Sequence, residues 1–162
     1  MARQAFTVEE ANVLIPTLEE ILEQVAAKKA AALVHYGKLK VLDTMWGEEI
    51  KKASNPDHGD FRQHFEKYAA LAQDIDALVE REIGGRGLRF PVGGLEHGLI
   101  DFPTTFEGRW VLLCWQKGED QVRFWHELDG GYAGRREILA EHIIHMGKDE
   151  NLPGDSPLDF GT

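Results

Sequence analysis

The sequence predicts an α+β protein: a long antiparallel helical hairpin, its first helix kinked near Pro16, packed with a small antiparallel β-meander of about three strands and a short C-terminal helix. Two observations support this fold class. Apolar residues recur at three- and four-residue steps through the first half of the chain, as in helices that bury one stripe. After Gly87, glycine becomes frequent and short apolar runs alternate with turns, which is typical of a meander.

The composition is that of an ordinary globular chain. Hydrophobic residues make up 43% and charged residues 28% of the 162 residues, a length that fits one domain. We therefore predict a single domain over residues 1–162. Its parts are the helical hairpin at 7–84, the meander with a motif loop at 85–139, and a short helix with a loose tail at 140–162.

The first helix begins with a capping box, in which the Thr7 hydroxyl and the Glu10 carboxylate each accept the other residue's amide. The apolar residues behind it share one helical face: Ala11, Leu14, Leu18, Ile21, Val25, Ala32, Leu39, Leu42 and Trp46. Pro16 lies too deep to be a first-turn proline and removes the amide that would bond Asn12. We expect a kink there.

A turn at residues 55–59 precedes the second helix, for which Asp60 is a candidate cap. Its stripe consists of Phe61, Phe65, Tyr68, Ala72, Ile75 and Val79. A continuous first helix would be roughly 65–70 Å long, and the second is roughly half as long. The first helix must therefore bend back or project beyond the body, and a projecting apolar stripe predicts a homodimer through the hairpin.

The second half contains the sheet and its connections. The expected elements are a strand at 99–102 ended by Pro103, a central strand at 109–115, a return strand at 121–129, a loop at 130–134 and a helix from about 137 to 146. Strand alternation places His126 on the face that also carries Leu112 and Cys114. Burial would lower the pKa of His126 unless a carboxylate accompanies it, and Asp101 is the nearest candidate.

Four segments carry a resemblance to a known family. They are FTVEEANVLIPTLEEI at 6–21, GLIDFP at 98–103, GRWVLLCWQKGE at 108–119 and FWHELDGGYAGR at 124–135. Together they resemble the family "domain of unknown function 2203". The resemblance implies a bacterial or archaeal cytosolic protein, and it carries over no activity, ligand or catalytic residue.

The second half also concentrates ionisable and aromatic residues, which is how small-ligand pockets are built. Candidate ligand-binding residues are Arg109, Trp115, Trp125, Asp129 and Arg135. The alternative is an ion-pair network that fixes the hairpin to its loops. Candidate catalytic residues are His126, Asp101 and Glu127.

A divalent metal is the one cofactor that the sequence leaves open. His126 and Glu127 would point to opposite faces of a regular strand, so both could bind one ion only across a bulge. His142 and His145 are three apart on the expected terminal helix and face the same side. The candidate metal ligands are therefore His126, His142 and His145.

Charge and cysteine usage exclude several classes of protein. The net charge of −10 disfavours nucleic acid and anionic membranes as partners. The N-terminal residues lack the apolar core of a signal peptide, and no apolar run is long enough for a membrane span. Cys114 is the only cysteine, so a disulfide within the chain and a zinc site of several thiolates are excluded. We predict a cytoplasmic protein.

Two functions remain. The first is a non-catalytic cytosolic binding or assembly protein that dimerises through its hairpin and holds a small molecule or a protein partner in a polar-aromatic pocket near the meander. The second is a small hydrolytic enzyme, with or without a metal. There His126 would be the base, Asp101 would orient it, and Arg109 or Arg135 would hold an anionic substrate group.

Overall fold

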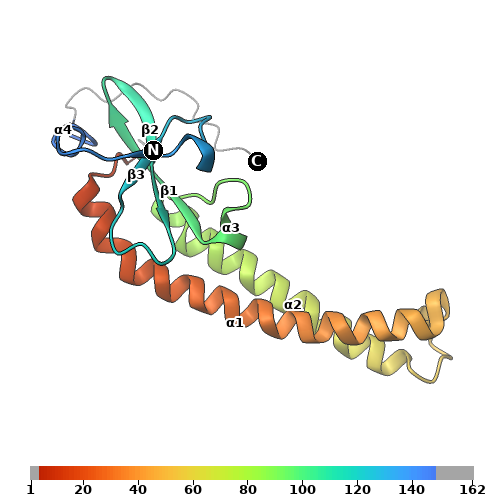
Figure 1. Cartoon of the computed structure of the whole chain (residues 1–162). Coiled ribbons are helices and arrows are strands. Elements are labelled where there is room, and N and C mark those ends of the chain that lie inside the picture. Colours follow the sequence, from red (N-terminus) through yellow and green to blue (C-terminus); the bar gives the residue numbers. More distant parts are fainter. Residues whose placement is uncertain (1–3, 149–162) are drawn as a thin grey trace. The chain divides into compact units, whose positions relative to one another are not determined.

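The computed structural model describes residues 4–148 and shows an α+β chain with two long helices, an antiparallel sheet and a short C-terminal helix, as the sequence predicts (Figure 1). The chain divides into two compact units. The first, here the sheet unit, comprises residues 4–20 and 81–148 of the described chain; the second, the hairpin unit, comprises residues 21–80. The loose tail predicted after the last helix lies outside the described residues, from 149 onward.

Helix α1 runs from Val8 to Trp46 and begins at the predicted capping box. The Glu10 amide donates to Thr7 Oγ1 at 3.1 Å, and the Thr7 amide donates to Glu10 Oε1 at 3.2 Å. Pro16 lies inside α1, which continues through it for 39 residues in all. Because Pro16 has no amide hydrogen, the carbonyl of Asn12 receives no helical bond from it.

The hairpin unit joins α1 to α2 (His58–Glu82) through a 3-10 helix at Gly47–Lys51. Trp46 Nε1 donates to Asp57 Oδ2 at 2.8 Å and so fixes the connecting turn. Helix α2 begins at His58, so Asp60 lies in its first turn and does not cap it. Farther along, the two helices bring His35 against His64, with their Nδ1 atoms 3.0 Å apart.

The sheet unit contains four antiparallel strands in the order β1-β2-β3-β4, one more than predicted. Their bounds are Leu99–Phe106, Arg109–Gln116, Phe124–His126 and Arg136–Glu137. Strands β1 and β2 meet in a two-residue turn in which Glu107 and Gly108 have φ values of 51° and 75°. Positive φ at both positions is typical of a type I′ hairpin turn, which matches the twist of the strands.

The prediction that Pro103 ends the first strand is wrong, because β1 continues to Phe106. Strand β1 is an edge strand, and its outer side bonds to other segments: Asp101 exchanges backbone hydrogen bonds with Arg89, and the Pro103 carbonyl accepts from Phe6 at 2.8 Å. Backbone groups two residues apart point the same way, so the missing amide of Pro103 also faces this outer side. A proline is tolerated there because β2 needs no bond from it.

The return strand is much shorter than the predicted 121–129. Its ladder begins only at Phe124, since the Val122 amide donates instead to the Asn12 side chain at 2.7 Å. It ends at His126, because the next residues turn, with Gly130 donating to the Glu127 carbonyl. The predicted loop at 130–134 is present and includes a 3-10 turn at Tyr132–Gly134.

The terminal helix is also shorter than the predicted 137–146. Residues Arg136–Glu137 pair with β3 as the added strand β4, and α4 covers only Ala140–Ile143. A further short helix, α3, occupies Gly94–His97. In the described part of the chain no helix combines the length and the apolar character that a membrane crossing requires.

Candidate functional site

The pleat of the sheet separates the charged motif residues onto two faces. Asp101 pairs with Cys114 in the β1–β2 register, while Cys114 pairs with Phe124 and Leu112 with His126 between β2 and β3. Asp101, Cys114 and His126 therefore share one face. Side chains alternate between the two faces along each strand, so Trp125 in β3 and Arg109 in β2 belong to the other face. The sequence predicted this sharing of Leu112, Cys114 and His126 correctly.

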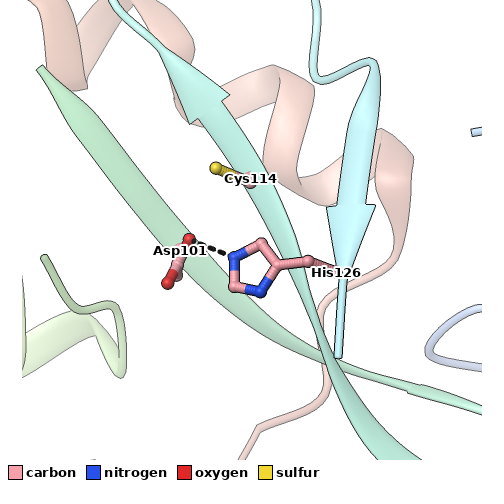
Figure 2. A group of neighbouring side chains, drawn as sticks. All are labelled: Asp101, Cys114 and His126. Atoms are coloured by element: carbon pink, nitrogen blue, oxygen red, sulfur yellow. Dashed lines mark hydrogen bonds and ion pairs between the residues drawn. The ribbon is translucent and has the colours of Figure 1, made fainter. Parts of the chain in front are cut away.

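The first face carries a buried pair formed by His126 and Asp101 (Figure 2). The imidazole Nε2 lies 3.1 Å from Asp101 Oδ1, and both side chains are 0% exposed. The other ring nitrogen, Nδ1, lies 2.7 Å from the Glu127 carbonyl. Arg89 Nε donates to the second carboxylate oxygen, Oδ2, at 3.2 Å. The two oxygens of Asp101 thus have different partners, His126 and Arg89.

These contacts suit a charged His126 ring. A carbonyl only accepts, so a hydrogen on Nδ1 donates to Glu127. A hydrogen on Nε2 would donate to the Asp101 carboxylate in the same way. Burial alone would lower the pKa of His126, but the hydrogen bond to Asp101 and the charge of that carboxylate outweigh burial and raise it.

Cys114 completes this cluster (Figure 2). Its side chain is 1% exposed, and burial, reinforced by the negative charge of Asp101, raises the pKa of the thiol to about 12. Such a thiol is chemically inert toward solvent reagents. The ligand atoms of Asp101, Cys114 and His126 all lie within 4.8 Å of one another. Among residues 4–148 they are the group of three donors that could hold a metal ion.

The second face opens into a surface recess of about 620 Å³, here called the Trp125 recess. It is lined by Phe106, Glu107, Arg109, Trp125, Arg136, Glu141, His142 and His145. The rings of Phe106, Trp125 and His142 meet edge to face, with centroids 5.2 to 5.6 Å apart. The Arg136 guanidinium lies 5.1 Å from the centre of the Trp125 ring. Cations therefore border an aromatic wall.

The polar groups of the recess differ in whether they already have hydrogen-bond partners. Arg109 is held by Glu127 through two hydrogen bonds of 2.6 and 3.1 Å, which raises the pKa of Arg109 and lowers that of Glu127. The Trp125 indole nitrogen is buried and bonds to no group of the described chain. His142 Nδ1 accepts from the Leu139 amide at 3.0 Å, which leaves Nε2 for another partner.

The remaining candidates lie away from the recess. Arg135 donates to Glu119 at 2.6 Å and to the Cys114 carbonyl at 3.2 Å, with its guanidinium 4.1 Å from the centre of the Phe124 ring. Burial opposes the charge of Arg135, but the bond to Glu119 raises its pKa. Trp115 is 0% exposed and donates to the Glu119 carbonyl. Asp129 is exposed.

Sequence reasoning missed three contributors to these sites. Arg89 follows a glycine-rich turn, and no motif tied it to Asp101. Phe106 and Arg136 border the recess only because β1 continues past Pro103 and because β4 exists. His142 and His145 both line the recess, although α4 ends at Ile143 and His145 therefore lies beyond the helix on which it was predicted.

Comparison with known proteins gives one result. The family model described as "Uncharacterized conserved protein (DUF2203)" matches residues 4–138. This range includes both faces of the sheet but not His142 or His145. No curated protein and no solved structure matches the chain.

Proposed function

The chain belongs to the uncharacterised family DUF2203, whose description gives no activity, and from that premise we propose a function based on the site: a non-catalytic cytosolic binding and assembly protein that holds a small planar anion in the Trp125 recess. The recess itself is the observation that carries this proposal. Its volume of about 620 Å³ suits a small molecule, and its wall is aromatic with a few polar groups at the border.

The charges of the recess favour an anionic group on the ligand. Arg109 is already neutralised by Glu127, whereas Arg136 is exposed and its guanidinium lies over the ring of Trp125. A ligand carboxylate or phosphate beside Arg136 would also meet His142 and His145. A planar group would pack against the aromatic wall to which Phe106, Trp125 and His142 contribute.

The hydrolytic alternative is weaker on geometric grounds. A general base must reach a substrate proton with a free lone pair. Both nitrogens of His126 are occupied, by Asp101 and by the Glu127 carbonyl, and the ring is 0% exposed. Arg109 lies on the opposite face of the sheet from His126 and cannot hold a substrate beside it.

The hairpin unit supports the assembly part of the proposal. Val34, Val41 and Met45 are 61%, 58% and 62% exposed, and their spacing of seven and four places them on one side of α1. The buried Ala32 and Leu42 lie on a different side of the helix. Exposed apolar residues on one side of a helix can mark an association site, and a second copy of this chain carries the same residues.

Binding is tested by nuclear magnetic resonance with benzoate as a planar anion, benzamide as its neutral analogue and inorganic phosphate as a non-planar anion. We expect benzoate to shift the indole N–H signal of Trp125 in a saturable manner, and benzamide and phosphate to bind more weakly. Arg136→Gln should weaken benzoate binding about tenfold, the usual effect of losing one charge-assisted hydrogen bond.

Arg123→Gln is the matched control, because Arg123 is exposed, pairs with Asp120 and does not line the recess. It should leave the titration unchanged. Equal shifts with benzoate and benzamide would contradict an anion site. A titration in which the Trp125 indole signal never moves would contradict binding in the recess.

A further inference from the structure

We propose that Asp101, Cys114 and His126 form a site for a single divalent transition-metal ion of the zinc class, on the face of the sheet opposite the Trp125 recess. The three side chains come from β1, β2 and β3, so the register of the sheet sets their positions. Figure 2 shows the three side chains as neighbours, with Asp101 and His126 joined by a hydrogen bond and the Cys114 sulfur beside them. This site is separate from the proposed ligand site and goes beyond the proposed function.

The donor set matches zinc in chemistry and in spacing. Imidazole nitrogen, thiolate sulfur and carboxylate oxygen are its usual ligands, at about 2.0 to 2.3 Å from the ion. Tetrahedral coordination at those lengths needs donor atoms about 3.3 to 3.8 Å apart. The three donors here lie within 4.8 Å of one another, so small side-chain rotations close the set. Mixed sulfur and nitrogen donors disfavour magnesium and calcium, which select oxygen.

The surroundings orient the ligands as metal sites require. A ligating histidine commonly donates its other ring N–H to a backbone carbonyl, and His126 Nδ1 donates to Glu127 at 2.7 Å. This bond leaves Nε2 directed at the cluster. Arg89 binds Asp101 Oδ2, which leaves Oδ1 as the coordinating oxygen. The Glu127 carbonyl and Arg89 thus orient two of the three proposed ligands, His126 and Asp101.

Charge balance favours the ion in a buried site. A metal ion binds an unprotonated imidazole nitrogen and a thiolate, so a cluster that holds both protons must release them. Binding of one M²⁺ displaces the Nε2 proton of His126 and the Sγ proton of Cys114, and both protons go to solvent. Two positive charges leave as one doubly charged ion enters, so the net charge of the buried cluster does not change. The exchange avoids the large cost of adding charge to a buried site.

Cobalt(II) is the probe, because its thiolate complexes absorb in the near ultraviolet. The full-length chain, without a histidine tag and with its thiol reduced, is incubated with Co²⁺ either as the native protein or during refolding, since a buried site loads as the chain folds. We expect one Co²⁺ per chain, a thiolate-to-cobalt charge-transfer band, and two protons released per ion as measured with a pH indicator.

Variants identify the ligands. Cys114→Ser should abolish the band, and Asp101→Asn should weaken Co²⁺ binding at least about tenfold. The control is the double variant His142→Gln/His145→Gln, which removes the two histidines that line the Trp125 recess. It should keep the charge-transfer band and the stoichiometry of one Co²⁺ per chain. Circular dichroism checks that each variant folds, and Cys114→Ala serves if the serine variant does not.

Two results would overturn the site. One is wild-type protein that refolds in Co²⁺ without acquiring the band. The other is Co²⁺ binding that is unchanged in Cys114→Ser or lost in the His142/His145 control.

Discussion

At the scale of single residues, the buried Asp101 carboxylate is the shared acceptor of His126 and Arg89. Its two oxygens bind His126 and Arg89, and its backbone pairs with Arg89 as well. Removing one partner of a buried pair leaves the other charge without compensation, and this loss costs more than the pair itself contributes. The substitutions with the largest effect on stability should therefore be at this position and at His126.

His126→Gln should lower the free energy of unfolding by about 3 kcal/mol at pH 6. Because the folded-state pKa of His126 is raised, its stabilisation is fully present below the unfolded value of about 6.5 and is lost as the pH rises through the folded value. The difference between wild type and variant should therefore shrink between pH 6 and pH 9 in urea unfolding. A difference that grows with pH would contradict an imidazolium in the folded state.

His35 titrates with the opposite sign. Partial desolvation and the nearby His64 lower the pKa of His35, so its contribution falls as the pH drops below about 6.5. The comparison for His126 is best made in a His35→Gln background, which removes this second titration. His35→Gln by itself should make the protein less sensitive to acid between pH 6.5 and pH 5.

The residue-scale features that sequence could predict follow from strand alternation. The period of two placed His126 with Leu112 and Cys114, and it put Asp101 on the neighbouring strand. It gave no information on Arg89, which reaches Asp101 from an isolated bridge outside the strands. It did place Glu127 on the face opposite His126, but it did not show that Glu127 pairs with Arg109, because that pairing depends on the register between β2 and β3.

At the scale of elements, the capping box of α1 predicts a measurable loss. Thr7→Ala removes the acceptor for the Glu10 amide and should cost about 1 kcal/mol of stability. Thr17→Ala is the matched control, since Thr17 lies inside α1, where alanine is the better helix former. The control should be neutral or slightly stabilising in chemical unfolding. An equal loss of stability in both variants would show that replacing any threonine with alanine, and not the loss of the cap, lowers the free energy of unfolding.

Pro16 gives an element-scale prediction of the opposite sign. Pro16→Ala restores an amide that can bond the Asn12 carbonyl inside α1, and the Pro16 side chain is exposed. We expect stabilisation of about 1 kcal/mol or more, within the ~3 kcal/mol that proline costs a helix interior. Destabilisation would show that the helix geometry imposed by Pro16 is needed for the Asn12–Val122 contact.

Helix periodicity and capping predicted both long helices, because these signals are local. The ends of β3 and the presence of β4 were not predictable in this way. Val122 leaves the ladder to bond Asn12, a residue 110 positions away, and β4 forms only against β3. Pro103 misled for the same reason, since its tolerance depends on β1 being an edge strand, which is a property of the whole sheet.

At the scale of the whole molecule, we expect a concentration-dependent dimer. Val34→Glu/Val41→Glu places two charges in the exposed stripe of α1 and should shift the protein to monomer in analytical ultracentrifugation. Val92→Glu is the control, because Val92 is fully exposed but lies outside the hairpin unit. A wild type that remains monomeric at high concentration, or an equal effect of the control, would contradict dimerisation through the hairpin.

The single thiol has a practical consequence for following the motions of this chain. Cys114 is closed off in the middle of the sheet, so a maleimide or disulfide reagent can modify it only when the strands part. The rate at which such a reagent labels Cys114 under native conditions therefore measures how often the sheet unit opens. In a Val92→Cys variant, a thiol-reactive dye would label the exposed new cysteine, while the buried Cys114 would remain unlabelled. The protein can thus carry a reporter probe with its own cysteine left in place.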